Sequence, residues 1–188
     1  MTAALWNFHL NRRRDARLRN EESLSVMAAL YGEILLLRNE AARLARAVAN
    51  VHITVGMDSR SVLKFTRHFV EANTLSEPIL YKAFATKLGM LNAAVVVAIT
   101  EFHSNFQKAR SWLPLLVEDK ERGYSYSVLA VLVPARDAVR DIVPTLRTME
   151  RLLSISKPAD DPPLGKTEDV IELEEAFHSE DRDTSSMF

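Results

Sequence analysis

The chain has 188 residues, of which 47% are hydrophobic and 26% are charged, values typical of a globular domain with a sizeable core. It contains no cysteine, which excludes a disulfide framework, a thiolate metal site and a cysteine nucleophile. The net charge of −1 conceals an asymmetry, because three basic and ten acidic residues give residues 157–188 a charge of −7 and leave +6 on residues 1–156. This split favours an anionic partner for the body, or contacts between the body and its own tail.

The first nineteen residues combine an apolar, aromatic opening with a cluster of arginines. The opening contains Trp6 and Phe8, and the cluster that follows consists of Arg12, Arg13, Arg14, Arg17 and Arg19. Aromatic side chains suit the headgroup level of a membrane, and guanidinium groups pair with acidic phosphates. We therefore predict that these seven residues bind an anionic membrane surface or another anionic partner. The longest uninterrupted apolar runs, of seven and six residues, are far shorter than the ~20 residues that span a bilayer.

A long helix is predicted from about Arg17 to Thr54. Its apolar residues recur at alternating steps of four and three, the spacing of a helix that packs along a seam. These seam residues are Leu30, Ile34, Leu37, Ala41, Leu44, Val48 and Val51. Neither proline nor glycine separates the arginines from Leu30, so we expect the arginine segment to continue into this helix without a break. Gly56 is expected to close the helix and Asp58 to cap the next one.

Two short helices are predicted next. The first extends from Ser59 to about Asn73, with Val62 and Phe65 among its inward residues. The second has Ser76 as its N-cap and continues through Leu88 to a stop at Gly89. Its first turn contains Pro78, and its expected inward face consists of Leu80, Phe84 and Leu88.

Two further segments repeat the spacing of four and three. The first is expected to begin after an Asn92 cap and to be kinked or shortened by Pro114; its seam residues are Val95, Ile99, Phe102, Phe106, Ala109, Leu113 and Leu116. The second covers residues 128–153, with Val128, Leu132, Ala135, Val139, Ile142, Leu146, Met149 and Leu153 on its seam. Pro134 and Pro144 interrupt it, so we expect a bent helix or two abutting helices.

These patterns predict an all-α fold, an elongated helical bundle with three long heptad-patterned helices, two short helices and a disordered acidic C-terminal tail. The expected divisions are an N-terminal segment at 1–19, the bundle at 20–156 and the acidic tail at 157–188. Within the largely disordered tail, Glu168–Phe177 has the apolar spacing of a short helix. The opposite charges of tail and body predict that the tail competes for the arginines at 12–19.

No motif for catalysis or metal binding is present. The chain lacks the two Glu-x-x-His pairs of a dimetal bundle site, a Gly-x-Ser-x-Gly elbow and a glycine-rich phosphate loop, so we predict no catalytic residue, no metal ligand and no cofactor. An enzyme or ligand-binding bundle would need a pocket in which polar residues such as Tyr31, His68 and His103 converge.

Three stretches resemble a group of small, functionally uncharacterised bacterial helical proteins: Trp6–Asp15, Met27–Ile34 and Pro78–Leu91. The resemblance covers about residues 6–110. In many proteins of this group a membrane-spanning helix precedes the arginine run, which implies that the arginines lie just on the cytoplasmic side of the membrane. In this chain the spanning helix is missing or reduced to Leu5–Leu10, so that either the anchor was lost or the chain begins at an internal start.

Together these features predict a non-enzymatic interaction or scaffold protein at or near the cytoplasmic membrane surface, peripheral to the inner membrane. Its partner is then an anionic membrane surface or a protein. The alternative is a nucleic-acid-associated regulator that uses the same arginines, extended along the first helix by Arg38, Arg43 and Arg46. The heptad seams also permit a homodimer.

Overall fold

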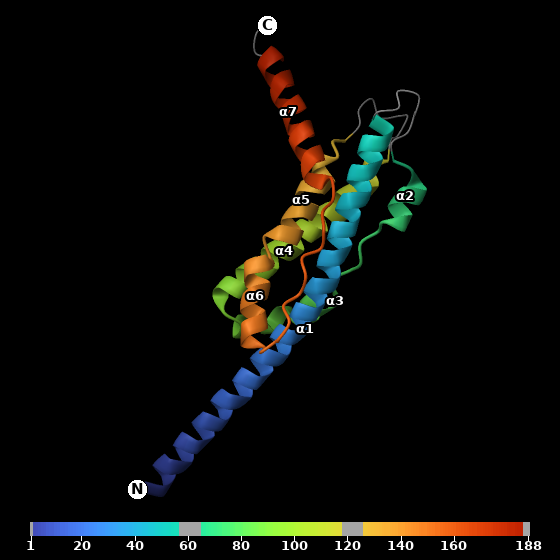
Figure 1. Ribbon diagram of the computed structural model, residues 1–188. Helices are drawn as coiled ribbons and strands as arrows, with labels where there is room; N and C mark the ends of the chain where they lie inside the picture. Colours follow the sequence, from blue (N-terminus) through green and yellow to red (C-terminus); the bar gives the residue numbers. More distant parts are fainter. Residues whose placement is uncertain (1, 57–64, 118–125, 186–188) are drawn as a thin grey trace.

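The computed structural model describes residues 2–56, 65–117 and 126–185, and the side-chain surroundings of residues 12–54, 65–117 and 126–177 (Figure 1). Every regular element in these ranges is a helix, which confirms the predicted all-α class. The predicted cap Asp58 and the predicted inward residue Val62 lie outside the described residues.

Helix α1 (Thr2–Gly56) is a single 55-residue helix, about 80 Å long at 1.5 Å per residue. The arginine segment continues into it without a break, as predicted. Its inner face is buried from Val26 onward and includes Leu30, Ile34, Leu37, Ala41, Leu44 and Val48, with Val51 partly buried. The N-terminal part extends beyond the rest of the molecule (Figure 1). We call residues 2–22 the arm.

Helices α4 and α5 complete the core with α1. Helix α4 (Ala93–Trp112) begins at Asn92, whose side chain accepts a hydrogen bond from the Ala94 amide at 2.9 Å, which confirms the predicted cap. At the position of Pro114 the α-helix gives way to the 3₁₀ helix η2 (Leu113–Leu116). Helix α5 (Leu129–Arg140) packs against both α1 and α4 and is therefore the central element of the bundle.

The segment with two prolines forms two abutting helices, one of the two predicted outcomes. Helix α5 passes through Pro134 unbroken and ends at Arg140, and α6 (Val143–Leu152) begins with Pro144 in its first turn. Proline in the first turn removes no helical hydrogen bond, which explains why the break falls at residues 141–142. Leu146 and Met149 of α6 are buried in the core.

The short helices differ from the predictions. Helix α2 (Arg67–Ala72) has Thr66 as its N-cap. Residues 65–66, which were predicted to be helical, therefore lie outside the helix, although Phe65 is buried as predicted. The helix predicted through Leu88 is divided into α3 (Ile79–Ala83) and the 3₁₀ helix η1 (Ala85–Met90).

The start of α3 is set by α1 rather than by the predicted Ser76 cap. Both carboxylate oxygens of Glu33 accept amide hydrogen bonds, from Leu80 at 2.6 Å and from Tyr81 at 2.8 Å. Ser76 instead donates its hydroxyl to Glu40 at 2.7 Å. This docking exposes Leu80, which was predicted to face inward, and packs Tyr81 against the core.

The acidic tail packs on the bundle over part of its length. Residues 155–166, which we call the strap, run alongside α1 without regular secondary structure and lead into α7 (Thr167–Ser185) (Figure 1). Thr167, Val170 and Ile171 are buried. The predicted short helix at Glu168–Phe177 thus lies within α7, and the expectation of a largely disordered tail is not confirmed for residues 157–177.

Candidate functional site

The arginines predicted to bind an anionic partner lie on the arm, and we call them the arginine collar. All five are exposed: Arg12, Arg13, Arg14, Arg17 and Arg19. Arg17 forms an ion pair with Glu21 at 2.8 Å, one helical turn away, and the other four form none with any residue that the structure describes. Trp6 and Phe8 lie on the helical backbone of the arm, but their side chains are outside the described residues.

The collar surrounds the helix instead of forming a stripe. At about 100° per residue, positions 12, 13, 14, 17 and 19 spread over roughly 220° of the helix circumference. The apolar residues Leu5, Trp6, Phe8 and Leu10 precede them along the axis rather than on an opposite face. Exposed guanidinium groups in this arrangement are able to contact several phosphates around the arm at once.

Arg38, Arg43 and Arg46, which were expected to extend this basic surface along α1, do not form one continuous exposed surface. Arg38 is only 2% exposed, and it donates hydrogen bonds to the Val139 carbonyl and the Asp161 carboxylate, both at 2.7 Å. It is therefore an internal group and cannot contact a phosphate. Arg43 is exposed and donates to the Ala72 carbonyl at 3.2 Å.

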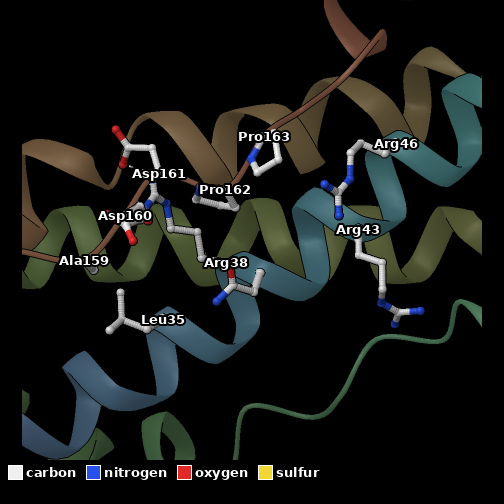
Figure 2. Close-up of a pocket in the computed structure, with 10 residues that line it drawn as sticks. Leu35, Arg38, Arg43, Arg46, Ala159, Asp160, Asp161, Pro162 and Pro163 are labelled. Carbon is white, nitrogen blue, oxygen red and sulfur yellow. Dashed lines mark hydrogen bonds and ion pairs between the residues drawn. The ribbon is translucent and has the colours of Figure 1, made fainter.

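A pocket of about 570 Å³ lies between α1 and the strap (Figure 2). Its lining contains Arg38, Arg43 and Arg46 from α1 and Asp160 and Asp161 from the strap, with Pro162 and Pro163. Figure 2 shows Arg46 beside the strap and Arg43 directed away from it. Arg38 already donates to the Asp161 carboxylate and Arg43 is directed away from the strap, so the three guanidinium groups do not converge on a single anion.

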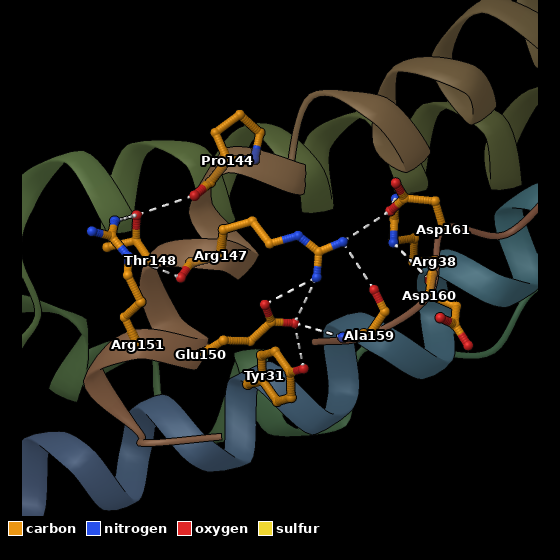
Figure 3. Close-up of polar contacts among 10 residues, drawn as sticks. All are labelled: Tyr31, Arg38, Pro144, Arg147, Thr148, Glu150, Arg151, Ala159, Asp160 and Asp161. Atoms are coloured by element: carbon orange, nitrogen blue, oxygen red, sulfur yellow. Dashed lines mark hydrogen bonds and ion pairs between the residues drawn. The ribbon is translucent and has the colours of Figure 1, made fainter. Parts of the chain in front are cut away.

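The strap is fastened by a buried network centred on Glu150 (Figure 3). The carboxylate, 3% exposed, accepts hydrogen bonds from the Tyr31 hydroxyl at 2.9 Å, the Ala159 amide at 2.8 Å and Arg147 at 3.0 Å. Burial would raise the pKa of Glu150, but these hydrogen bonds together hold it below its ordinary value. Burial and the Glu150 carboxylate raise the pKa of Tyr31 to about 12. This network joins α1, α6 and the strap, which is a structural role.

Sequence reasoning missed a second buried polar pair, between Glu33 and His103. The Ile99 carbonyl, 2.8 Å away, can only accept, so His103 Nδ1 donates to it. His103 Nε2 lies 3.6 Å from Glu33 Oε2 and has no hydrogen-bond partner among the described residues. Burial lowers the pKa of His103 and the Glu33 charge opposes this shift. The imidazole stacks on Tyr81, with ring centroids 3.8 Å apart, beside a pocket of about 500 Å³.

The residues named for a ligand pocket do not converge. Tyr31 is part of the Glu150 network, His103 faces Glu33, and His68 is exposed on α2. Within the described ranges no three His, Asp or Glu side chains gather closely enough to hold a metal ion. None of the described helices combines the length and the apolar character that crossing a bilayer requires.

No protein-family model, curated protein or solved structure matches the chain. The most distinctive exposed feature of the described residues is the arginine collar on the projecting arm (Figure 1).

Proposed function

We propose that the protein is a non-enzymatic interaction or scaffold module that attaches to the cytoplasmic membrane surface through the arm of α1. One observation carries the proposal: the arm extends beyond the body and presents five exposed arginines, four of which form no ion pair with a described residue. The aromatic residues Trp6 and Phe8 precede them along the same helix. Aromatic side chains at the headgroup level followed by guanidinium groups at the phosphates match the chemistry of an anionic leaflet.

The expected attachment is weak and reversible. A basic residue near an anionic leaflet contributes about 1 kcal/mol, so the five arginines contribute about 5 kcal/mol, equivalent to a Kd of about 0.2 mM. A short apolar segment adds to this but does not anchor the chain permanently. Attachment of this strength responds to salt and to the anionic lipid content of the membrane.

The arm and the core part of α1 belong to one continuous helix, so the orientation of the arm fixes the orientation of the body. The same helix α1 contains Arg19 and the buried residue Leu30, so a membrane that holds the arm also sets the direction of the bundle. His52 near the other end of α1 contacts Glu174 of α7 at 3.0 Å. The 33 residues from Arg19 to His52 correspond to about 50 Å of helix, so α7 is presented well away from the membrane.

Vesicle sedimentation tests the proposal. We expect the full chain to sediment with phosphatidylserine-containing vesicles at low salt and not with phosphatidylcholine vesicles. Neutralising three collar arginines in Arg12→Gln/Arg13→Gln/Arg14→Gln should weaken binding about 100-fold, and Trp6→Ala about tenfold. The matched control Arg67→Gln/Lys108→Gln/Lys166→Gln removes the same charge from exposed sites on the body and should bind as the natural chain does.

Two outcomes overturn the proposal. In one, the collar variant and the matched control lose vesicle binding equally, which makes net charge the cause. In the other, the chain binds duplex DNA or RNA with a steep salt dependence. This binding persists in the Trp6→Ala variant, and anionic vesicles do not displace the nucleic acid. That second result favours the nucleic-acid alternative, although the burial of Arg38 removes part of the basic track on which it depends.

A further inference from the structure

Helix α7 has an apolar inner face, and two further apolar residues at the edge of that face, Leu173 and Phe177, are exposed; together with the exposed carboxylates of Asp169, Glu172 and Glu175 we call them the outer face of α7. Val170 and Ile171 are buried against the body. Leu173 and Phe177, one turn apart, are 51% and 58% exposed, and Asp169 and Glu172 are exposed beside them. Apolar anchors at this spacing, with charges around them, are typical of a helix that packs against a second helix or a groove.

The charge of α7 is only partly used within the fold. Its eight acidic residues and one arginine give it a charge of −7. Glu168 contacts Arg140 at 3.0 Å and Glu174 contacts His52 at 3.0 Å, so these two carboxylates fasten α7 to the body. The exposed Asp169, Glu172 and Glu175 form no ion pair with a described residue.

The arginine collar of the same chain cannot reach this face. Helix α7 is held near His52, about 50 Å along α1 from Arg19, and Figure 1 shows the arm and α7 at opposite ends of the molecule. The prediction that the tail competes for the arginines of its own chain is therefore wrong for α7. Contact between these two surfaces requires a second copy.

We propose that the outer face of α7 binds the arm of a second copy of this chain. The segment 12–19 has five arginines and one aspartate, a charge of +4 against −4 on residues 169–177. Leu18, 53% exposed among these arginines, supplies an apolar contact for Leu173 and Phe177. Residues 12–19 and 169–177 also match in length, about 11 Å and 12 Å of helix. Complementary charge, exposed apolar groups and similar length thus occur on two surfaces that one molecule cannot bring together.

This contact is head-to-tail, because each copy offers one arm and one α7. An association of this kind propagates into chains unless its geometry closes a ring. It also uses the arginines that the proposed membrane attachment uses, so anionic lipid and α7 compete for the arm. Because the contact is mainly electrostatic and exposed, we expect it to weaken strongly as salt rises.

Charge reversal with purified full-length protein, without lipid, tests this contact. The arm variant is Arg12→Glu/Arg13→Glu/Arg14→Glu, and the α7 variant is Asp169→Lys/Glu172→Lys/Glu175→Lys. In sedimentation velocity at about 0.05 M NaCl, the average mass of the natural chain should rise with concentration beyond that of a dimer and fall to the monomer at about 0.5 M. Each variant alone should associate at least tenfold more weakly, whereas the control Arg67→Glu/Lys108→Glu/Lys166→Glu should not.

Mixing the two variants gives the sharpest result. The α7 variant keeps a natural arm, the arm variant keeps a natural α7, and the reversed charges of the two changed surfaces also complement each other, so the mixture should associate again although each variant alone does not. Three results overturn the proposal: a natural chain that stays monomeric at low salt, an arm variant that associates as well as the natural chain, or a mixture that stays monomeric. The α7 variant should still bind anionic vesicles, so failure of this contact is distinguishable from failure of the membrane attachment.

Discussion

Replacing Glu150 by glutamine tests whether the buried network fastens the strap. Glutamine has nearly the shape of glutamate, so Glu150→Gln opens no cavity. Tyr31 and Ala159 both donate to Glu150 Oε1, and a glutamine carbonyl oxygen at that position still accepts both hydrogen bonds. The glutamine amide group, however, replaces Oε2 and places its donors against Arg147 Nη1, which lies 3.0 Å from Oε2. The substitution thus removes the charge pair and leaves the packing.

The expected loss of stability is about 2–3 kcal/mol. A hydrogen bond between charged groups contributes about 1.5–3 kcal/mol, and hydrogen bonds to a neutral acceptor are weaker than those to a carboxylate. The Arg147 side chain is 36% exposed and can turn toward water, which keeps the loss below the ~3–5 kcal/mol of a fully buried broken pair. For a chain of 188 residues, this corresponds to a fall in Tm of about 5–10 °C.

Urea unfolding followed by circular dichroism measures this loss, with exposed Glu172→Gln as the control that should stay within about 0.5 kcal/mol. The low pKa of Glu150 means that its contribution is present above the ordinary value of 4.5 and is lost as pH falls through the folded pKa. The difference between the natural chain and Glu150→Gln should therefore shrink in acid. An equal stability at pH 7, or effects of Glu150→Gln and Arg147→Gln that simply add, would refute the network as the fastening of the strap.

Four other substitutions are expected to change the stability of the fold in a stated direction. The pKa of Tyr31 is raised by burial and its carboxylate partner to about 12, so it stabilises the fold fully below pH 10 and less as pH rises toward 12; thermal unfolding of Tyr31→Phe should lack this alkaline loss. Ser154 has a φ of 56° directly after α6, so Ser154→Gly should stabilise by about 0.5–1 kcal/mol in urea unfolding. Gly165 has a φ of 59° and a Cβ there would lie 3.2 Å from Arg46 Cγ, so Gly165→Ala should destabilise by about 1–2 kcal/mol. Asn92→Ala removes the α4 cap and should cost about 1 kcal/mol, detectable as a lower Tm.

Local rules predicted much of the helical framework. The buried residues of α1 and α4 follow from the spacing of apolar side chains, because that spacing alone decides which side of a helix avoids water. The cap at Asn92 follows from its own side chain, and the division before Pro144 is one of the two outcomes expected from the prolines, whereas Pro134 lies inside α5. Each of these features depends on residues within one or two turns.

The remaining features depend on residues far apart in the chain. Arg38 and Arg43 look alike in the sequence, but only Arg38 is buried, because Val139 and Asp161, more than 100 residues away, supply its acceptors. The acidic composition of the tail favoured disorder, yet Val170 and Ile171 are buried where α7 packs on the body. The Glu33–His103 pair joins two helices, and no pattern within either helix indicates the other.

The order of the elements has a consequence for synthesis on the ribosome. The inner face of α1 is made first, but α5 and α6, which cover much of it, begin about 80 residues after Val48. At ~5–20 residues per second, the nascent chain leaves that face uncovered for on the order of 10 s. Leu44 and Val48, which no water reaches in the folded protein, are then open to chaperones or to another nascent chain. Translation pauses before residue 129 should therefore increase misassembly more than pauses after α6.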